Sequence, residues 1–141
     1  MSRLLNFGSL CVDWVYQVPN LVGAGETIAS NSLAVHPGGK GLNQSIAAAL
    51  AGADVLHFGA VGKDGAALLD ALRGAGVDTN GVLELDSASG HALIQVDSQG
   101  RNAIVIHPGT NRSVPQNHWQ LMLDSMTVSY THLTLPTICS V

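Results

Sequence analysis

Residues 36–45, HPGGKGLNQS, place three glycines around Lys40 directly before an alanine-rich segment. A glycine-lined backbone lets a ligand approach closely, and the start of a helix offers N–H groups that bind oxygen atoms. Lys40 adds a positive charge, and Asn43 adds an amide that both donates and accepts hydrogen bonds. The motif therefore predicts a site for a polar ligand; the alternative is a packing turn with a solvated lysine.

Two known phosphate-binding loops do not fit this motif. A Walker A loop needs a glycine six positions before the lysine and a serine or threonine after it, where this chain has Ala34 and Gly41. A dinucleotide fingerprint needs a third glycine at the position of Gln44. The ligand must therefore be recognised in another way.

Asp13 supplies a carboxylate that could face the same ligand, because it follows a short apolar segment near the start of the chain. A carboxylate accepts hydrogen bonds from hydroxyl groups. Carboxylate, amide and bare glycine backbone together suit a polyol or a sugar. The alternative is an aspartate at the surface with no ligand.

The elements that would position these residues follow from the spacing of apolar side chains. Residues 4–10 are short and apolar, which predicts a buried strand that ends near Asp13. Residues 12–18 and 27–35 are β-rich and predict a small antiparallel layer. Residues 42–51 carry apolar side chains at helical spacing, so a helix should follow the glycine motif.

Strands and helices continue to alternate after this helix. Residues 54–61 predict a strand, and Asp64 is expected to cap a second helix. Leu68, Leu69 and Leu72 would form one apolar stripe on that helix. This alternation predicts an α/β fold.

From residue 90 the pattern predicts a hairpin, because HALIQVD and RNAIVIH flank a turn at residues 98–100. Alternation groups the apolar side chains on one face of each strand: Ala92, Ile94 and Val96 in the first, Ile104 and Ile106 in the second. A final helix is expected from about residue 113, with one apolar side made by Trp119, Met122, Leu123 and Met126.

Composition excludes several classes of protein. The hydrophobic share of 46% predicts a folded chain, and a net charge of −4 with six scattered Lys and Arg residues argues against nucleic-acid binding. No segment is apolar enough to predict a membrane span or a secretory signal, so a cytoplasmic protein is expected. Cys11 and Cys139 have no metal-ligand spacing, and no metal site is predicted.

Several further segments occur in a characteristic order: GSLCVD at residues 8–13, AGET at 24–27, VGKDG at 61–65, GVDT at 76–79 and IHPGTN at 106–111. Together with the glycine motif, they resemble the ribokinase-like (PfkB) carbohydrate kinase family up to about residue 127. The resemblance implies an incomplete ribokinase-like three-layer α/β sandwich with a small β-sheet lid. The lid would comprise residues of about 12–35 and 90–107.

The resemblance also implies that ATP, with Mg²⁺, phosphorylates a sugar hydroxyl. Four matching residues would hold the sugar: Asp13, Gly38, Gly39 and Asn43. Lys40 would approach the transferred phosphoryl group, and Ala92 and Ile106 would be apolar lid positions over the sugar. A homodimer formed through the lid is implied as well.

The sequence departs from this family in two places. Cys11 stands where ribokinases usually have an asparagine that binds the sugar, and this puts ribose in doubt as the substrate. The family's second signature, which carries the catalytic base and the anion hole, does not occur. The chain is therefore expected to be the sugar-binding N-terminal part of a sugar kinase, with no catalytic base and no activity of its own. The alternatives are a nucleoside kinase of the same fold and a non-catalytic sugar-binding module.

The last segment, residues 128–141, does not continue the pattern of strands and helices. Its sequence, VSYTHLTLPTICSV, is similar to what results when a sequencing-library adapter is read through as coding sequence. We therefore expect a kinase part over residues 1–127 and a non-native tail over residues 128–141. A short natural strand is the alternative for this tail.

Overall fold

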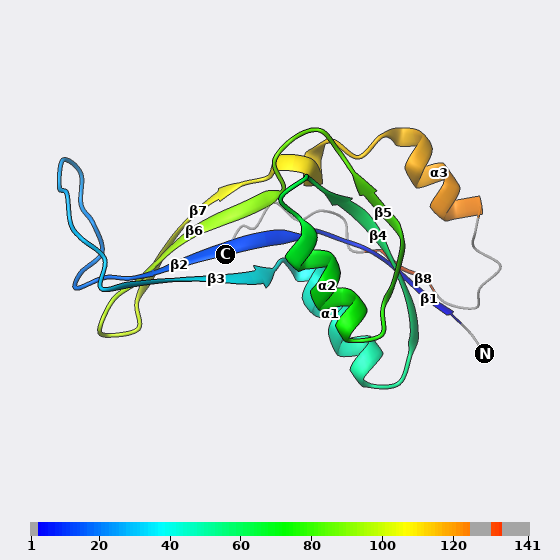
Figure 1. Ribbon diagram of the computed structural model, residues 1–141, viewed down its shortest axis with the longest axis horizontal. Helices are drawn as coiled ribbons and strands as arrows, with labels where there is room; N and C mark the ends of the chain where they lie inside the picture. The colour runs from blue at the N-terminus through cyan, green and yellow to red at the C-terminus, as the bar shows by residue number, and fades with distance from the viewer. Residues whose placement is uncertain (1–2, 125–130, 134–141) are drawn as a thin grey trace.

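The computed structural model describes residues 3–124 and 131–133, and its strands form two separate sheets (Figure 1). The first sheet has the order β5-β4-β1-β8, and all its neighbouring strands are parallel. Its strands are β1 (Arg3–Phe7), β4 (Asp54–Val61), β5 (Asp78–Glu84) and β8 (Thr131–Leu133). Parallel strands joined through helices confirm the predicted α/β class.

Helices cover both faces of the first sheet. α1 (Lys40–Leu50) and α2 (Ala66–Gly74) lie side by side on one face, and α3 (Gln116–Asp124) lies on the other (Figure 1). The core under α1 and α2 includes seven buried side chains: Leu10, Leu42, Val55, Val61, Leu68, Leu72 and Val77. A smaller core under α3 contains Leu5, Phe7, Phe58 and Met122. The first core includes Val61 at the carboxyl end of β4, and the second includes Phe7 at the carboxyl end of β1.

The second sheet projects from this body as a long, twisted layer (Figure 1). Its order is β3-β2-β6-β7, with two antiparallel pairs around a parallel pair of β2 and β6. The strands are β2 (Cys11–Gln17), β3 (Ser32–Gly38), β6 (Gly90–Val96) and β7 (Asn102–His107). The antiparallel layer and the hairpin, which the sequence predicts separately, thus form one mixed sheet.

The structure corrects the prediction that Asp64 caps the second helix. α2 begins after Gly65 and has no side-chain cap. The Asp64 carboxylate instead accepts hydrogen bonds from the Ser89 backbone N–H at 2.9 Å and from the Ser89 hydroxyl at 2.7 Å. Burial would raise the pKa of the Asp64 carboxyl, but these bonds lower it below its ordinary value. Asp64 therefore anchors the start of β6.

The structure differs from the sequence-based expectations at three other places. β3 begins at Ser32 and not at residue 27, so the connection from β2 is longer than predicted. β5 is absent from the expectations, because its sequence, DTNGVLE, interrupts the apolar residues with polar ones. Leu123 of α3, which was expected on the apolar side of the helix, is exposed, whereas His118 of the same helix is buried. Met126 lies outside the described residues.

The segment expected to be a non-native tail contains β8, which pairs in parallel with β1. The remainder of residues 128–141 lies outside the described part of the chain. Among the residues described, no helix has the length and apolar character needed to cross a membrane.

Candidate functional site

The register of the second sheet brings four residues into one row. Asp13 lies opposite His36 of β3 on one side and opposite Ala92 of β6 on the other, and Ala92 lies opposite Ile106 of β7. Paired residues in neighbouring strands point to the same face of a sheet. The sequence-predicted Asp13, Ala92 and Ile106 therefore share one face.

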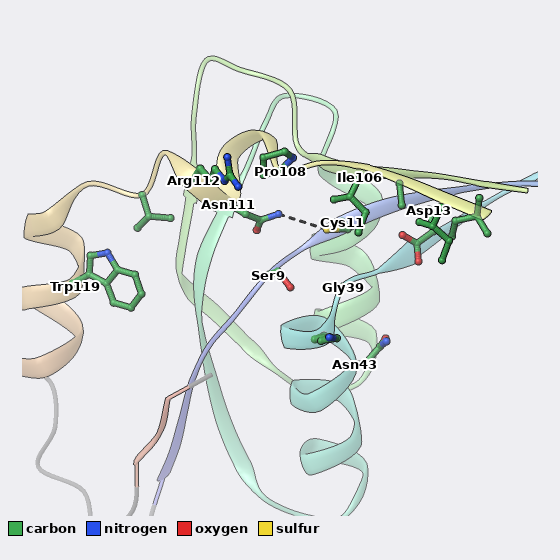
Figure 2. A pocket seen from close by; sticks show the side chains of 15 residues that line it. Ser9, Cys11, Asp13, Gly39, Asn43, Ile106, Pro108, Asn111, Arg112 and Trp119 are labelled. Atoms are coloured by element: carbon green, nitrogen blue, oxygen red, sulfur yellow. Dashed lines mark hydrogen bonds between the residues drawn. The ribbon is translucent and has the colours of Figure 1, made fainter. Parts of the chain in front are cut away.

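That face forms one wall of a cavity of about 630 Å³ between the second sheet and the start of α1. Six of the seven predicted site residues line the cavity: Asp13, Gly39, Lys40, Asn43, Ala92 and Ile106. Figure 2 shows Asp13 and Ile106 at one end and Trp119 at the other, with Cys11 and Asn111 between them. The fold thus gathers residues that lie up to 93 positions apart in the sequence.

Gly38 and Gly39 are needed where β3 passes into α1. Gly39 has a φ of 101°, a conformation that favours glycine, and a Cβ there would lie 2.6 Å from the Ser9 carbonyl oxygen. A Cβ on Gly38 would overlap the Asp13 carboxylate. Gly39 therefore lines the cavity, while Gly38 lies against Asp13 and is the one predicted residue outside the cavity wall.

The Asp13 side chain is half-buried, and its carboxylate forms no hydrogen bond with a described residue. Burial raises the pKa of its carboxyl above the ordinary value, and the charge of His36 on the neighbouring strand opposes this shift. A partly desolvated carboxylate that has no protein hydrogen-bond donor can accept hydrogen bonds from a ligand's hydroxyl groups.

Lys40 and Asn43 lie in the first turn of α1, and both side chains are exposed at the cavity. No acidic residue occupies this turn, and no side chain caps it. Among the described residues, none forms an ion pair with Lys40. The helix start therefore presents a positive end and a lysine ammonium toward the cavity, opposite Asp13.

Eight residues that the sequence did not indicate as site residues also line the cavity: Ser9, Ile94, Ile104, Pro108, Asn111, Arg112, Val114 and Trp119. Strand alternation could have found Ile94 and Ile104, since they lie opposite each other in the next inward-facing row. The segment IHPGTN contains Asn111, but nothing local indicates where its side chain points. Trp119 reaches the cavity because α3 packs against β1, where the Trp119 ring stacks on Phe7. Arg112 and Val114 belong to the segment between β7 and α3.

Comparison with known proteins now identifies the family. Residues 1–137 match the family described as pfkB family carbohydrate kinase. The chain belongs to this family. The predicted resemblance is therefore confirmed, and so is the ribokinase-like fold.

Individual relatives are ribokinases. The chain is 36% identical to a ribokinase of Bacillus subtilis over 119 residues, which cover 81% of this chain and 40% of the relative. It is similar to the crystal structure of a ribokinase from Cryptococcus neoformans in complex with ADP, with 37% identity and a TM-score of 0.82 over 94% of this chain and 42% of that one.

A ribokinase of Arabidopsis thaliana, solved with ribose and ATP, matches with 30% identity and a TM-score of 0.74, over 82% of this chain and 39% of that one. The chain thus spans less than half the length of these relatives.

Proposed function

We propose that this chain provides the sugar-binding part of an ATP-dependent, ribokinase-like sugar kinase. The observation that carries the proposal is the cavity in which Asp13, Ala92 and Ile106 of the second sheet lie opposite Lys40 and Asn43 of α1. Membership of the pfkB family and similarity to a ribokinase solved with ribose and ATP support it.

Each residue has a role that follows from its chemistry. Asp13 accepts hydrogen bonds from sugar hydroxyls, and Asn43 offers both a donor and an acceptor. Ala92 and Ile106 cover the apolar side of the sugar ring, while Gly38 and Gly39 keep the backbone close to it. Lys40 neutralises charge on the phosphoryl group that moves to the sugar.

ATP would approach from the open side of the cavity, where Lys40 and the start of α1 suit phosphate oxygens. In the described part of the chain, no three His, Cys, Asp or Glu side chains come together as metal ligands. Mg²⁺ would accompany ATP and bridge its phosphate oxygens. We propose that the chain by itself binds sugar without turning over ATP.

The cavity also favours a second candidate, a nucleoside kinase. Beyond Cys11 and Asn111 it continues to Val114 and Trp119, whose apolar surfaces exceed what a pentose requires and would suit a nucleobase. Calorimetric titration with D-ribose and with inosine separates the two candidates. Tighter binding of inosine by tenfold or more would favour the nucleoside kinase.

The Asp13→Asn variant tests the role of Asp13. Loss of hydrogen bonds to a charged group should weaken D-ribose binding by about 1.5–3 kcal/mol, a factor of roughly 10 to 150. The Asp64→Asn variant is a matched control, because Asp64 anchors β6 outside the cavity. Equal dissociation constants for Asp13→Asn and the unaltered chain would remove Asp13 from the site. If neither ribose nor inosine binds the unaltered chain, a wider panel of sugars tests the two remaining possibilities, a kinase for another sugar and a non-catalytic sugar-binding module.

We also propose a homodimer that forms through the outer face of the second sheet. Val35, Trp14, Leu93 and Val105 form one row across all four strands on the face opposite Asp13. These side chains are 39–67% exposed, which is unusual for an apolar row in water. Sedimentation of the unaltered chain and of Leu93→Lys tests this: the variant should remain monomeric at concentrations where the unaltered chain is a dimer.

A further inference from the structure

The side chain of Asn111, just after β7, holds the segment that connects β1 to β2. Its Oδ1 accepts a hydrogen bond from the Leu10 backbone N–H at 3.0 Å, and its Nδ2 donates to the Leu10 carbonyl oxygen at 2.9 Å. Nδ2 also lies 3.6 Å from the Cys11 sulfur. One carboxamide thus satisfies both backbone groups of a residue 101 positions away.

Leu10 needs these bonds because it lies between the two sheets. Its side chain is fully buried, and it belongs to neither β1 nor β2. Buried backbone N–H and C=O groups require partners, and here the Asn111 amide takes the place that a neighbouring strand would fill. The path of the chain into β2 therefore depends on this side chain.

Gly90 leaves the space that the amide occupies. Gly90 lies opposite Cys11 in the pairing of β6 with β2, and a Cβ on Gly90 would overlap Asn111 Nδ2. The Asn111 amide can therefore reach Leu10 only because residue 90 has no side chain. A substitution at either residue should disturb the same bonds.

These bonds lie next to the sugar site. Cys11 and Asp13 are alternate residues of β2, so they face the same cavity, and Asn111 lines that cavity as well (Figure 2). We propose that Asn111 is a positioning residue: it holds the start of β2 and so sets where Cys11 and the Asp13 carboxylate meet the sugar. This inference rests on the proposed sugar-binding role of Asp13.

The test compares Asn111→Ala and Gly90→Ala with Ser89→Ala. Ser89 is buried at the neighbouring link between β5 and β6, where its hydroxyl accepts a hydrogen bond from the Gly62 N–H at 2.8 Å, and it does not line the cavity. All three variants disturb a link between the sheets, but only the first two release Leu10. Thermal unfolding gives the stability of each variant, and calorimetry with D-ribose gives its affinity while it is folded.

We expect Asn111→Ala and Gly90→Ala to weaken ribose binding about tenfold each, with no further loss in the double variant. Asn111→Asp keeps the acceptor for the Leu10 N–H but places a carboxylate oxygen against the Leu10 carbonyl oxygen, so it should weaken ribose binding at least as much as Asn111→Ala. Ser89→Ala should lower the melting temperature while the dissociation constant stays within twofold. The same affinity for Asn111→Ala as for the unaltered chain, or equal losses in Asn111→Ala and Ser89→Ala, would overturn the inference.

A second readout does not depend on sugar binding. The rate at which a thiol reagent modifies Cys11, measured in a Cys139→Ser background, should rise at least threefold in Asn111→Ala and remain unchanged in Ser89→Ala. If the unaltered chain binds no sugar, the proposed function fails, and this rate alone decides whether Asn111 positions the start of β2. Equal rates in both variants would then refute the positioning role.

Discussion

The two sheets of this protein bury their side chains very differently. Residues 57–61 of β4 are all buried, whereas every residue of β7 is exposed. The first sheet is held by apolar cores on both faces, while the second depends on strand pairing and on side-chain links to the body, such as those of Asp64 and Asn111. The cavity thus lies between a well-packed body and a layer that buries little apolar surface.

The largest expected effect comes from truncating one leucine in the core of the first sheet and one leucine on the outer face of the second sheet. Leu72 of α2 is fully buried under the first sheet, so Leu72→Ala should lower the free energy of unfolding by about 2–5 kcal/mol. Leu93 of β6 is 44% exposed, and Leu93→Ala should cost less than about 1 kcal/mol. Urea denaturation at low protein concentration measures both. A large loss for Leu93→Ala would mean that a second copy covers the outer face.

The next effect concerns acid stability and arises from a buried polar network between α1 and the first sheet. The His57 ring lies 3.2 Å from the Gly8 carbonyl oxygen through Nε2 and 2.7 Å from the Ser45 hydroxyl through Nδ1. Because a carbonyl only accepts, Nε2 carries the proton and Nδ1 accepts from Ser45. The Asn6 amide donates to Ser45 Oγ and to the Gly41 carbonyl oxygen. The network is satisfied only when His57 is neutral.

Burial lowers the pKa of His57 to about 4, although its hydrogen bond to Gly8 acts in the opposite direction. In the unfolded chain the same group takes up a proton below about pH 6.5. Stability should therefore fall as the pH drops from about 6.5 to 4, by up to about 3 kcal/mol. Urea titrations of the unaltered chain and of His57→Phe between pH 7 and 4.5 test this. The variant should be less stable at pH 7 but lose less on acidification, and parallel curves would contradict the assignment.

The smallest of the three effects compares the two faces of the second sheet. Ile106 faces the cavity and its neighbour Val105 faces outward, since successive side chains of a strand alternate. Ile106→Asp should weaken ribose binding about tenfold and shift the melting temperature by only a few degrees. Val105→Asp, at a side chain 67% exposed, should leave ribose binding within twofold. A much larger fall in the melting temperature of Ile106→Asp would indicate that Ile106 is a core residue and not part of the cavity wall.

Much of the site could be predicted because it follows local patterns. The helix after the glycine motif, the strand at Asp54–Val61 and the hairpin are each encoded by apolar spacing over a few residues. The six predicted residues that line one cavity were chosen from the glycine motif, from Asp13 and from the resemblance to the PfkB family, and the resemblance alone implied Ala92 and Ile106. Reliance on local patterns also explains the wrong prediction for Asp64. Asp64 has the sequence position of a helix cap, but its carboxylate accepts a hydrogen bond from Ser89, 25 residues away.

The sequence by itself determined the family, the alternation of strands and helices, and which side chains of each strand share a face, because these depend on residue order and on the two-residue period of a strand. Only the tertiary structure decided which strands are neighbours. It placed β2 beside β6 and so set Asp13 next to Ala92. It also brought the Asn111 amide to Leu10 and buried His57 beside Ser45. Such contacts join positions far apart in the chain. A backbone or side-chain polar group needs a protein partner only after the packed sheets and helices have removed it from water, and the sequence does not show which groups these are.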